Sequence, residues 1–330
     1  MSALRGQAVL VTGAGGFIGS HLTEALVQRG ARVRAFIRYN SRGDCGLLDL
    51  LPATVRDEID VRFGDLRDAD TVRRTAEGIG TIFHLGALIA IPYSYISPRD
   101  VVETNVLGTL NVLEAARAHN VSRVLHTSTS EVYGTAQYVP IDERHPLQGQ
   151  SPYSASKIGA DQLAESFARS FGLPVSIVRP FNTYGPRQSA RAIIPTIISQ
   201  ALTGGTLRLG SLKPTRDLLY VGDTAAGFCA IAEHEAAIGK VMNLGTGIEV
   251  SVGDLVRTIG TLLGTELEVT EDTQRLRPVN SEVGRLLADA TLAREVCGWQ
   301  ATVTLEQGLS HVIGWMRDHL ARYRPEIYMV

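Results

Sequence analysis

Two residues in the middle of the chain, Tyr153 and Lys157, have the types and the spacing of a catalytic acid–base pair. The 330-residue chain carries 32 Lys and Arg residues, but only three of them are lysines, so a lysine at this position stands out. Side chains four residues apart lie on one face of a helix, one turn apart. Because an ammonium beside a phenol favours the phenolate, we expect this pair to act as a general base near neutral pH.

A polar segment ahead of this pair adds three candidate residues. Thr129, Ser130 and Glu131 follow an apolar run, Val121–His126, that we expect to form a strand. At the carboxyl edge of a sheet, a hydroxyl can orient a substrate oxygen and a carboxylate can take a proton from carbon. We interpret this segment as catalytic because the chain also carries the Tyr–Lys pair and, near its N-terminus, a glycine-rich loop that can bind phosphate.

The elements that position these residues begin near the N-terminus. Ala8–Val11 is a short apolar run, and it is followed by Gly13, Gly16 and Gly19 and then by a helical pattern. Glycines at this spacing permit a tight turn, close approach of the backbone to a pyrophosphate, and free N–H groups at a helix N-terminus. The segment therefore predicts a dinucleotide-binding loop.

Strand and helix signals alternate along the chain, which predicts an α/β fold with a doubly wound parallel sheet. The expected strands are Ala8–Val11, Val33–Ile37, Ile59–Phe63, Thr81–His84, Val121–His126, Val175–Arg179, Leu218–Val221 and Val241–Leu244. We assign residues 1–180 with 217–245 to a dinucleotide-binding Rossmann domain, and 181–216 with 246–330 to a smaller C-terminal substrate domain. Ligands are expected between the two, at the carboxyl ends of the strands.

Three motifs together resemble a known family. Thr12–Gly19, the Tyr153/Lys157 pair, and Asp65-Leu66 after the third expected strand are similar to the extended short-chain dehydrogenases/reductases. The resemblance covers nearly the whole chain and implies a nicotinamide dinucleotide cofactor. The cofactor-binding residues that it implies are Gly13, Gly16, Phe17, Ile18, Gly19, Asp65, Leu66, Leu85, Ala87, Tyr153 and Lys157.

Further segments resemble one branch of this family. Thr127–Gly134 is similar to the nucleotide-sugar 4,6-dehydratases, and its Thr-Ser-Glu form resembles GDP-mannose 4,6-dehydratase. His84–Tyr95 together with Pro180–Arg187 looks closest to the N-acetylglucosamine-nucleotide 4,6-dehydratases of legionaminic acid biosynthesis. The resemblance implies conversion of a nucleotide-diphosphate hexose or N-acetylhexosamine to its 4-keto-6-deoxy form.

This reaction gives each catalytic candidate a role. Tyr153 would take the proton of the sugar 4-hydroxyl as the C4 hydride leaves, and Lys157 would lower the pKa of the phenol and hold the nicotinamide ribose. Thr129 would orient the same sugar oxygen. Glu131 would remove the C5 proton that the 4-keto group acidifies. Ser130 stands where many family members have Asp, and would relay a proton to the departing 6-hydroxyl.

The end of the second expected strand bears on cofactor choice. NAD-binding proteins use an acidic residue there to accept hydrogen bonds from the ribose. This chain has Arg38, Ser41 and Arg42 in that segment, with no acid before Asp44. Because an Arg can pair with a 2′-phosphate that a carboxylate would repel, we expect NADP in preference to NAD.

Arginines are also expected on the substrate side, because the guanidinium fork pairs with phosphate oxygens. Arg216 and Arg277 resemble the diphosphate-binding arginines of the family, and Asn182 resembles its substrate-binding Asn. Arg187 and Arg191 are weaker candidates. The predicted partner is therefore a nucleotide-diphosphate sugar.

Bulk composition argues against several other classes of protein. A net charge of −2 gives no reason to expect a nucleic-acid partner. No run of about 18 apolar residues occurs and the N-terminus lacks a signal-peptide pattern, so we expect a cytoplasmic protein with no membrane partner. The three cysteines lack metal-ligand spacing, and no metal site is predicted.

Alternative functions stay open. A nucleotide-sugar 4-epimerase would share these motifs, but it needs no base at C5 and would leave Glu131 without a role. UDP-glucuronate decarboxylases share Thr-Ser-Glu-Val-Tyr-Gly, although their Tyr motif usually has acidic residues where this chain has Ser154–Ser156. A non-catalytic cofactor-sensing module of the same fold would not need both Tyr153 and Lys157.

Two expected helices indicate an oligomer. Asn105–His119 and Tyr153–Phe171 carry apolar residues on more than one face, and a helix that is apolar beyond one stripe needs a second partner. Related enzymes pair these helices across a twofold axis. We therefore predict a homodimer.

Overall fold

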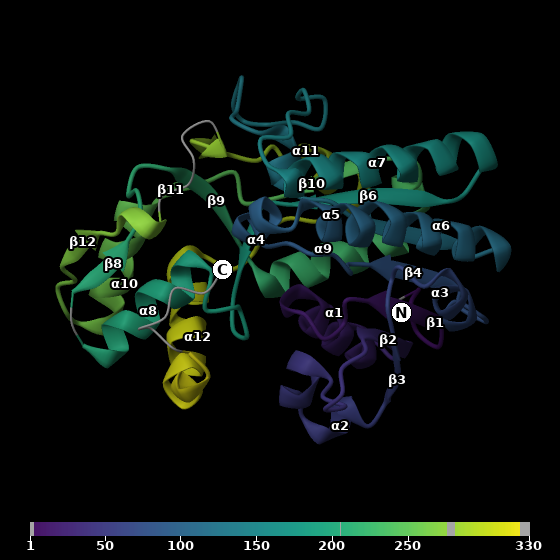
Figure 1. Cartoon of the computed structure of the whole chain (residues 1–330), viewed down its shortest axis with the longest axis horizontal. Helices are drawn as coiled ribbons and strands as arrows, with labels where there is room; N and C mark the ends of the chain where they lie inside the picture. The colour runs from purple at the N-terminus through teal and green to yellow at the C-terminus, as the bar shows by residue number, and fades with distance from the viewer. Residues whose placement is uncertain (1–2, 205, 276–280, 324–330) are drawn as a thin grey trace.

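The computed structural model describes residues 3–204, 206–275 and 281–323 (Figure 1). Its larger part is built on a seven-stranded sheet in which all neighbouring strands are parallel, in the order β3-β2-β1-β4-β5-β6-β10. The strands are β1 (Ala8–Thr12), β2 (Arg32–Arg38), β3 (Ile59–Gly64), β4 (Thr81–His84), β5 (Arg123–Thr127), β6 (Val175–Pro180) and β10 (Val241–Leu244). This order confirms the predicted doubly wound Rossmann sheet, whose direction of winding reverses between β1 and β4.

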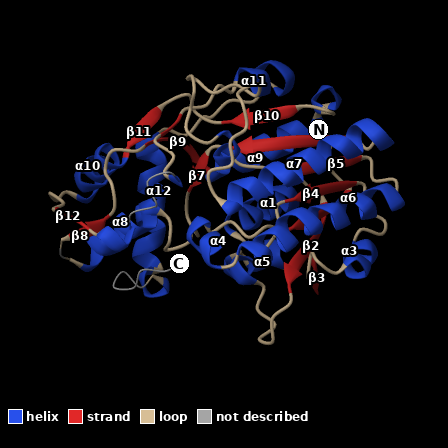
Figure 2. Cartoon of the chain, turned by 45° about the horizontal axis from the view of Figure 1, so that its top comes forward, coloured by secondary structure: helices blue, strands red, loops and turns tan. Residues whose placement is uncertain are grey.

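Helices cover both faces of this sheet (Figure 2). Val9 and Val11 of β1 belong to the core on one face, whereas Leu10 between them belongs to the core on the other. The first face is covered by α1 (Phe17–Gln28), α9 (Val221–Glu233) and α11 (Thr291–Cys297). The second face is covered by α3 (Ala69–Thr75), α6 (Gly108–Ala118) and α7 (Pro152–Phe171). Burial on both faces explains why the central strands read as continuous apolar runs.

The helix expected over Asn105–His119 is interrupted. It consists of α5 (Pro98–Val102), a π-helical turn (Glu103–Leu107) and α6. Such turns are rare and often mark functional sites, and the buried Asn105 lies in this one. The remaining short helices of the larger part are α2 (Ala53–Arg56), α4 (Ile91–Ile96) and 3₁₀ turns at Gly46–Leu50, Ser130–Tyr133 and Glu235–Ala237.

The smaller part has its own core, on the left in Figure 1. Its strands are β7 (Asn182–Tyr184), β9 (Thr215–Tyr220), β11 (Glu249–Ser251) and β13 (Arg285–Leu286) in one sheet, and β8 (Leu207–Leu209) with β12 (Val269–Glu271) in another. Its helices are α8 (Ile193–Thr203), α10 (Val252–Leu263) and α12 (Leu305–Asp318), with 3₁₀ turns at Thr273–Arg275 and Leu320–Arg322. Among the described residues, no helix is both long and apolar enough to cross a membrane.

One predicted strand lies in a different sheet. The Leu218–Val221 segment was expected to return to the large sheet, and this expectation is wrong, because β9 pairs with β7, β11 and β13. Leu218 packs in the core of the smaller part and Leu219 in the core of the larger one. An apolar run at the junction of two cores is buried in either sheet, so its composition does not reveal its pairing. The domain boundaries stay a prediction.

Candidate active site

The glycine loop is shaped by contacts between backbone atoms. Gly13 has a φ of +70°, and a Cβ there would lie 2.8 Å from the Cα of Gly86. A Cβ on Gly19 would overlap the carbonyl oxygen of Gly13. Helix α1 begins at Phe17, and its N-cap, Gly16, places no side chain on the first N–H groups. The loop therefore fits a pyrophosphate, which needs close backbone approach and open N–H donors.

Predicted cofactor residues from three strand ends meet beside this loop. Leu85 donates its N–H to the carbonyl of Thr12 at 3.2 Å, and Gly86 donates to Thr12 Oγ1 at 3.0 Å. A Cβ on Gly86 would lie 2.7 Å from Leu66 Cδ1, so the Leu66 side chain packs against the same turn. Ala87 continues that turn after β4. Ile18, in the first turn of α1, packs against the neighbouring core.

Arg38 and Asp65 lie near each other at the ends of β2 and β3. The Asp65 carboxylate accepts from Arg67 Nη2 at 2.6 Å, and this hydrogen bond, with the charges of Arg67 and Arg38, holds its pKa below the usual range. Ser41 is exposed in the turn that follows β2. Arg38 and the hydroxyl of Ser41 therefore lie at and after the end of β2, as the sequence predicted. The Asp65 carboxylate, in contrast, is already paired with Arg67.

Tyr153 and Lys157 are buried in the first turns of α7. The helix starts with Pro152 and a capping box in which the side chains of Ser151 and Ser154 bond each other's backbone N–H groups, so its first turn is firmly defined. Lys157 donates from Nζ to the carbonyl of Thr127 at 2.6 Å. Burial lowers the pKa of Lys157 to about 8, although the charge of Asp161 acts to raise it.

Thr129, Ser130 and Glu131 leave β5 toward Tyr153. Thr129 caps the 3₁₀ turn that starts at Ser130, and its Oγ1 accepts the N–H of Glu131 at 3.2 Å. Burial raises the pKa of Tyr153; a hydrogen bond with Thr129 acts to lower it, and the charge of Glu131 to raise it further. These groups therefore lie together. Burial is the largest influence on the pKa of the phenol.

The substrate candidates differ in their surroundings. Asn182 begins β7, and its Oδ1 is buried without a hydrogen-bond partner among the described residues. Arg216 donates from Nη1 to the carbonyl of Thr215 at 2.9 Å and lies 3.4 Å from Glu282. Arg277 lies outside the described residues.

The two weaker arginine candidates are placed differently. Arg187 is 9% exposed, and its Nη2 donates to Glu24 of α1 at 2.7 Å. Its Nε also lies 3.3 Å from His21 Nε2. Arg191 is exposed and contacts Ser189. Arg187 therefore links the loop after β7 to helix α1, which accounts for its burial without a ligand.

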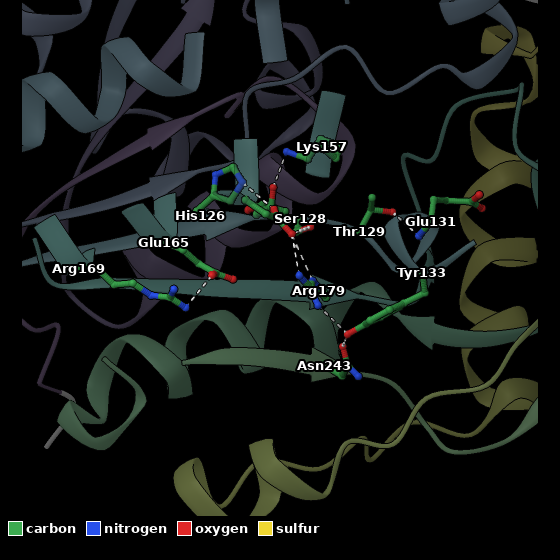
Figure 3. A network of polar contacts seen from close by, with 12 residues as sticks. His126, Ser128, Thr129, Glu131, Tyr133, Lys157, Glu165, Arg169, Arg179 and Asn243 are labelled. Carbon is green, nitrogen blue, oxygen red and sulfur yellow. Dashed lines mark hydrogen bonds and ion pairs between the residues drawn. The ribbon is translucent and has the colours of Figure 1, made fainter. Parts of the chain in front are cut away.

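A buried ionic network that the sequence analysis did not assign lies beside the candidate catalytic residues (Figure 3). Asp161, one turn after Lys157 on α7, accepts from Ser128 Oγ at 2.7 Å, from His126 Nε2 at 3.1 Å and from Arg179 Nη2 at 3.0 Å. Burial acts to raise the pKa of Asp161, but the hydrogen bond from His126 and the neighbouring positive charges hold it below the usual range. The only signal in the sequence is the four-residue step from Lys157.

A second chain of hydrogen bonds joins the glycine loop to α7. His84 Nδ1 lies 2.7 Å from Thr12 Oγ1, and its Nε2 lies 3.0 Å from Thr109 Oγ1. The Thr109 hydroxyl donates to Asn105 O at 2.6 Å, so it must accept from His84 Nε2–H. Asn105 in turn donates to Ser156 Oγ at 2.9 Å. The order of donors places a proton on His84 Nε2, and burial, which lowers the pKa of His84, favours the neutral ring.

A doubly wound parallel sheet, a glycine loop after its first strand, and a Tyr–Lys pair beside it define the class as the short-chain dehydrogenases/reductases. The family model described as GDP-mannose 4,6 dehydratase matches residues 10–312, and the chain therefore belongs to this family. Its relatives carry out more than one reaction on nucleotide sugars.

The dTDP-glucose 4,6-dehydratase of Streptomyces antibioticus is 34% identical over 328 residues, which cover 96% of this chain and 94% of the relative. The UDP-glucose 4-epimerase of Mycolicibacterium smegmatis is 35% identical over 316 residues, covering 94% and 98%. Among solved structures, dTDP-glucose 4,6-dehydratase DesIV of Streptomyces venezuelae, with NAD and TYD bound, superposes with a TM-score of 0.83 at 30% identity, covering 97% and 99%. The chain is thus similar to dehydratases and to epimerases.

Proposed function

We propose that the chain is a nucleotide-sugar 4,6-dehydratase that forms a 4-keto-6-deoxy sugar with no net change of redox state. The observation that carries this proposal is the position of Glu131. Its backbone N–H bonds the side chain of Thr129, which is hydrogen-bonded with Tyr153, and its charge acts to raise the pKa of the phenol. A 4-epimerase needs only the base at the 4-hydroxyl, whereas a dehydratase needs a second base at C5, and a carboxylate beside the first base can serve there.

The first step concerns the sugar 4-hydroxyl. A bound nicotinamide dinucleotide would supply the hydride acceptor and, in its oxidised form, a positive ring charge. Tyr153 takes the hydroxyl proton, and Thr129 orients the oxygen through the hydrogen bond that it now shares with the phenol. Burial raises the pKa of Tyr153, so the phenolate needs nearby positive charge. We assign this role to Lys157, which lies one helical turn away on α7.

The second step eliminates water. The 4-keto group acidifies the C5 proton, and Glu131 removes it. The 6-hydroxyl leaves with a proton, for which Ser130 is the relay. Ser130 is only 2% exposed, so this proton reaches it from Glu131 or from a water held beside it. Hydride returns to C6 and a proton to C5, which balances the reaction as loss of one water.

The cofactor is proposed to be a nicotinamide dinucleotide held by the glycine loop and by Leu66, Leu85 and Ala87. DesIV carries NAD, and so does the dTDP-glucose 4,6-dehydratase of Bacillus anthracis, a neighbour with a TM-score of 0.84 at 27% identity that covers 97% of this chain and 99% of its own. The NADP preference predicted from the sequence rests on Arg38 and Arg42, of which Arg42 pairs with Asp44 at 3.0 Å.

The substrate is proposed to be a nucleotide-diphosphate hexose or N-acetylhexosamine, with the N-acetylglucosamine form favoured by the His84–Tyr95 and Pro180–Arg187 resemblance. The unpartnered Oδ1 of Asn182 supports a ligand contact, and Arg216 is the described candidate for the diphosphate. The UDP-N-acetylglucosamine 4-epimerase of Methanobrevibacter ruminantium, in complex with UDP-N-acetylmuramic acid, is a solved neighbour with a TM-score of 0.86 at 27% identity. A mass-resolved panel of nucleotide sugars tests this choice.

Solvent deuterium separates the dehydratase from the 4-epimerase. In heavy water a dehydratase places deuterium at C5 of its product and lowers the mass by one water, whereas a direct 4-epimerase leaves C5 and the mass unchanged. Glu131→Gln should abolish water loss while reduced cofactor still forms, because Tyr153 and Lys157 serve that first step. Glu165→Gln, a surface substitution on α7, is the matched control. Near wild-type turnover by Glu131→Gln, or a product without deuterium at C5, would assign the chain to the epimerases.

We also propose a homodimer formed through the helices beside the active site. Ile96, Val102, Leu107 and Phe171 are large apolar side chains that are 45–70% exposed, and they lie on α4, α5, the π-helical turn and α7. A monomeric mass in light scattering at micromolar concentration would contradict this proposal.

A further inference from the structure

Asp161 joins the catalytic helix to two strands of the large sheet. It lies on α7 one turn after Lys157, and its side chain is fully buried. One carboxylate oxygen accepts from His126 on β5, and the other accepts from Ser128, which follows β5, and from Arg179 on β6. With four donor atoms around it, the carboxylate is satisfied as an anion in the core.

The same network reaches the far end of the segment that carries Thr129 and Glu131. Ser128, held by Asp161, comes immediately before this segment. Tyr133 ends its 3₁₀ turn, and the Tyr133 hydroxyl accepts from Arg179 Nη1 at 3.0 Å and donates to Asn243 Oδ1 of β10 at 2.7 Å. Both ends of the catalytic segment are therefore tied to one buried ion pair, Asp161 with Arg179 (Figure 3).

Among the described charged groups around Lys157, Asp161 is the anion whose charge acts on it, although its carboxylate pairs directly with Arg179. His126 on β5 and His84 on β4 are both fully buried, and burial lowers the pKa of each, so neither adds charge near neutral pH. Arg179 on β6 is engaged by Asp161 itself, and Glu131 lies beyond Thr129, toward Tyr153. Because a buried ammonium is costly without a nearby anion, the carboxylate one turn along α7 has a direct effect on Lys157.

We propose that Asp161 is a positioning residue for the reaction: it keeps Lys157 charged, and through Ser128 and Arg179 it holds the Thr129–Tyr133 segment against α7. The effect on Lys157 concerns the protein alone and can be measured without turnover. The kinetic consequence rests on the proposed function, because it is Tyr153 that needs the Lys157 charge.

The small number of lysines makes Lys157 directly observable. The chain has three, and Lys213 and Lys240 are exposed. Protein labelled with carbon-13 at lysine Cε should give three titrating signals by NMR, with the Lys157 midpoint near its lowered pKa of about 8. In Asp161→Asn this midpoint should fall by about one pH unit, whereas the other two signals stay in place as internal references. An unchanged Lys157 midpoint would overturn the proposal.

Two further variants separate charge from folding. Ser128→Ala removes one hydrogen bond to Asp161 but keeps the carboxylate, so the Lys157 midpoint should stay at its wild-type value. Asp161→Asn leaves the buried charge of Arg179 without its carboxylate partner. If that variant does not fold, the double variant Asp161→Asn with Arg179→Met removes both buried charges. The Lys157 midpoint should again fall, because Asp161 acts on Lys157 more strongly than Arg179 does. A midpoint that moves in Ser128→Ala, or fails to move in the double variant, would overturn the assignment of Asp161 as counter-ion.

The pH profile then tests the kinetic part. Activity should fall as pH rises through the Lys157 pKa, because the ammonium is lost above it. Asp161→Asn should move this basic limb to lower pH by the same amount as the NMR midpoint, whereas Ser128→Ala should lower kcat without moving it. A limb that stays in place while the midpoint moves would overturn the kinetic role. If no nucleotide sugar is turned over, the proposed function fails while the NMR titration still decides the role of Asp161.

Discussion

The glycine loop and the arginines predicted for the substrate side are built in opposite ways. The loop is formed by glycines whose backbone atoms touch, so that Cβ atoms on Gly13 or Gly19 would overlap other backbone. The arginines are long side chains already engaged by acids of the same chain: Arg187 by Glu24, and Arg216 by Glu282. A loop shaped by backbone contacts has its form before any ligand binds. The charge of a side chain can instead be used in an ion pair that stabilises the fold, and then it is not free for a ligand. An arginine in a motif is thus weaker evidence for a phosphate site than a glycine whose Cβ has no room.

Arg187 illustrates this difference. It is a buried residue with a φ of +68°, a conformation that non-glycine residues rarely adopt. Its guanidinium pairs with Glu24 and lies beside His21, whose pKa falls to about 3 because of burial and the Arg187 charge. Both partners lie on α1, the helix that starts at the glycine loop. The structure therefore gives Arg187 a role in joining the smaller part of the molecule to the cofactor helix.

This comparison predicts that the largest effect of a substitution on ligand binding will be found in the glycine loop. In Gly19→Ala the new methyl group would overlap the Gly13 carbonyl and come within 2.9 Å of Ala14 Cα, so backbone must move. We expect the dissociation constant for the dinucleotide to rise at least about a hundredfold, or about 2.8 kcal/mol, by calorimetric titration. Gly314→Ala on α12 is the control, because no atom lies within 4 Å of its Cβ position and cofactor binding should be unaffected. Wild-type affinity in Gly19→Ala would mean that the loop is not a preformed cradle.

The next largest effect should be on stability. Arg187→Ala leaves Glu24 unpaired, and because that carboxylate is 25% exposed we expect a loss of about 2 kcal/mol, less than for a fully buried pair. Thermal denaturation should show Tm lower by several degrees. Arg191→Ala, at an exposed Arg on the same loop, should leave Tm unchanged. If Arg187→Ala instead keeps Tm and raises KM for the nucleotide sugar, Arg187 is a ligand and the contrast between the two sides fails.

The contrast also explains which features the sequence predicted. Strands β4 and β10 begin and end where expected, and helix α7 begins one residue earlier than expected. These elements could be predicted because each follows from local periodicity in the sequence. The pairing of β9 and the role of Arg187 depend on contacts with residues far away in the sequence. For example, Arg187 and Glu24 are 163 positions apart. Such pairs leave no local pattern.

The buried network around Asp161 also depends on contacts between residues that are far apart in the sequence. Tyr153 and Lys157 could be recognised because their spacing is a helical turn, and Asp161 continues that spacing on the same helix. Its partners Ser128 and Arg179 come from other elements, and only the fold brings them to one carboxylate. Sequence patterns therefore point to catalytic candidates more readily than to the residues that position them.

A variant of Arg38 tests whether any arginine of this molecule is as well suited to a phosphate as the glycine loop. Arg38 ends β2 and its charge acts on Asp65, but no ion pair of Arg38 with an acid occurs among the described residues, unlike Arg187. Arg38→Asp should weaken NADP binding by about 1.5–3 kcal/mol through loss of a charge-assisted contact, and should spare or improve NAD binding. Arg42→Ala is the matched control, because Arg42 is exposed and already pairs with Asp44 at 3.0 Å.

Calorimetric titration of wild type and both variants with NAD and with NADP measures these effects. A wild-type protein that binds NAD more tightly than NADP would show that Arg38 does not select the phosphate, and the preformed loop would then be the main determinant of cofactor binding.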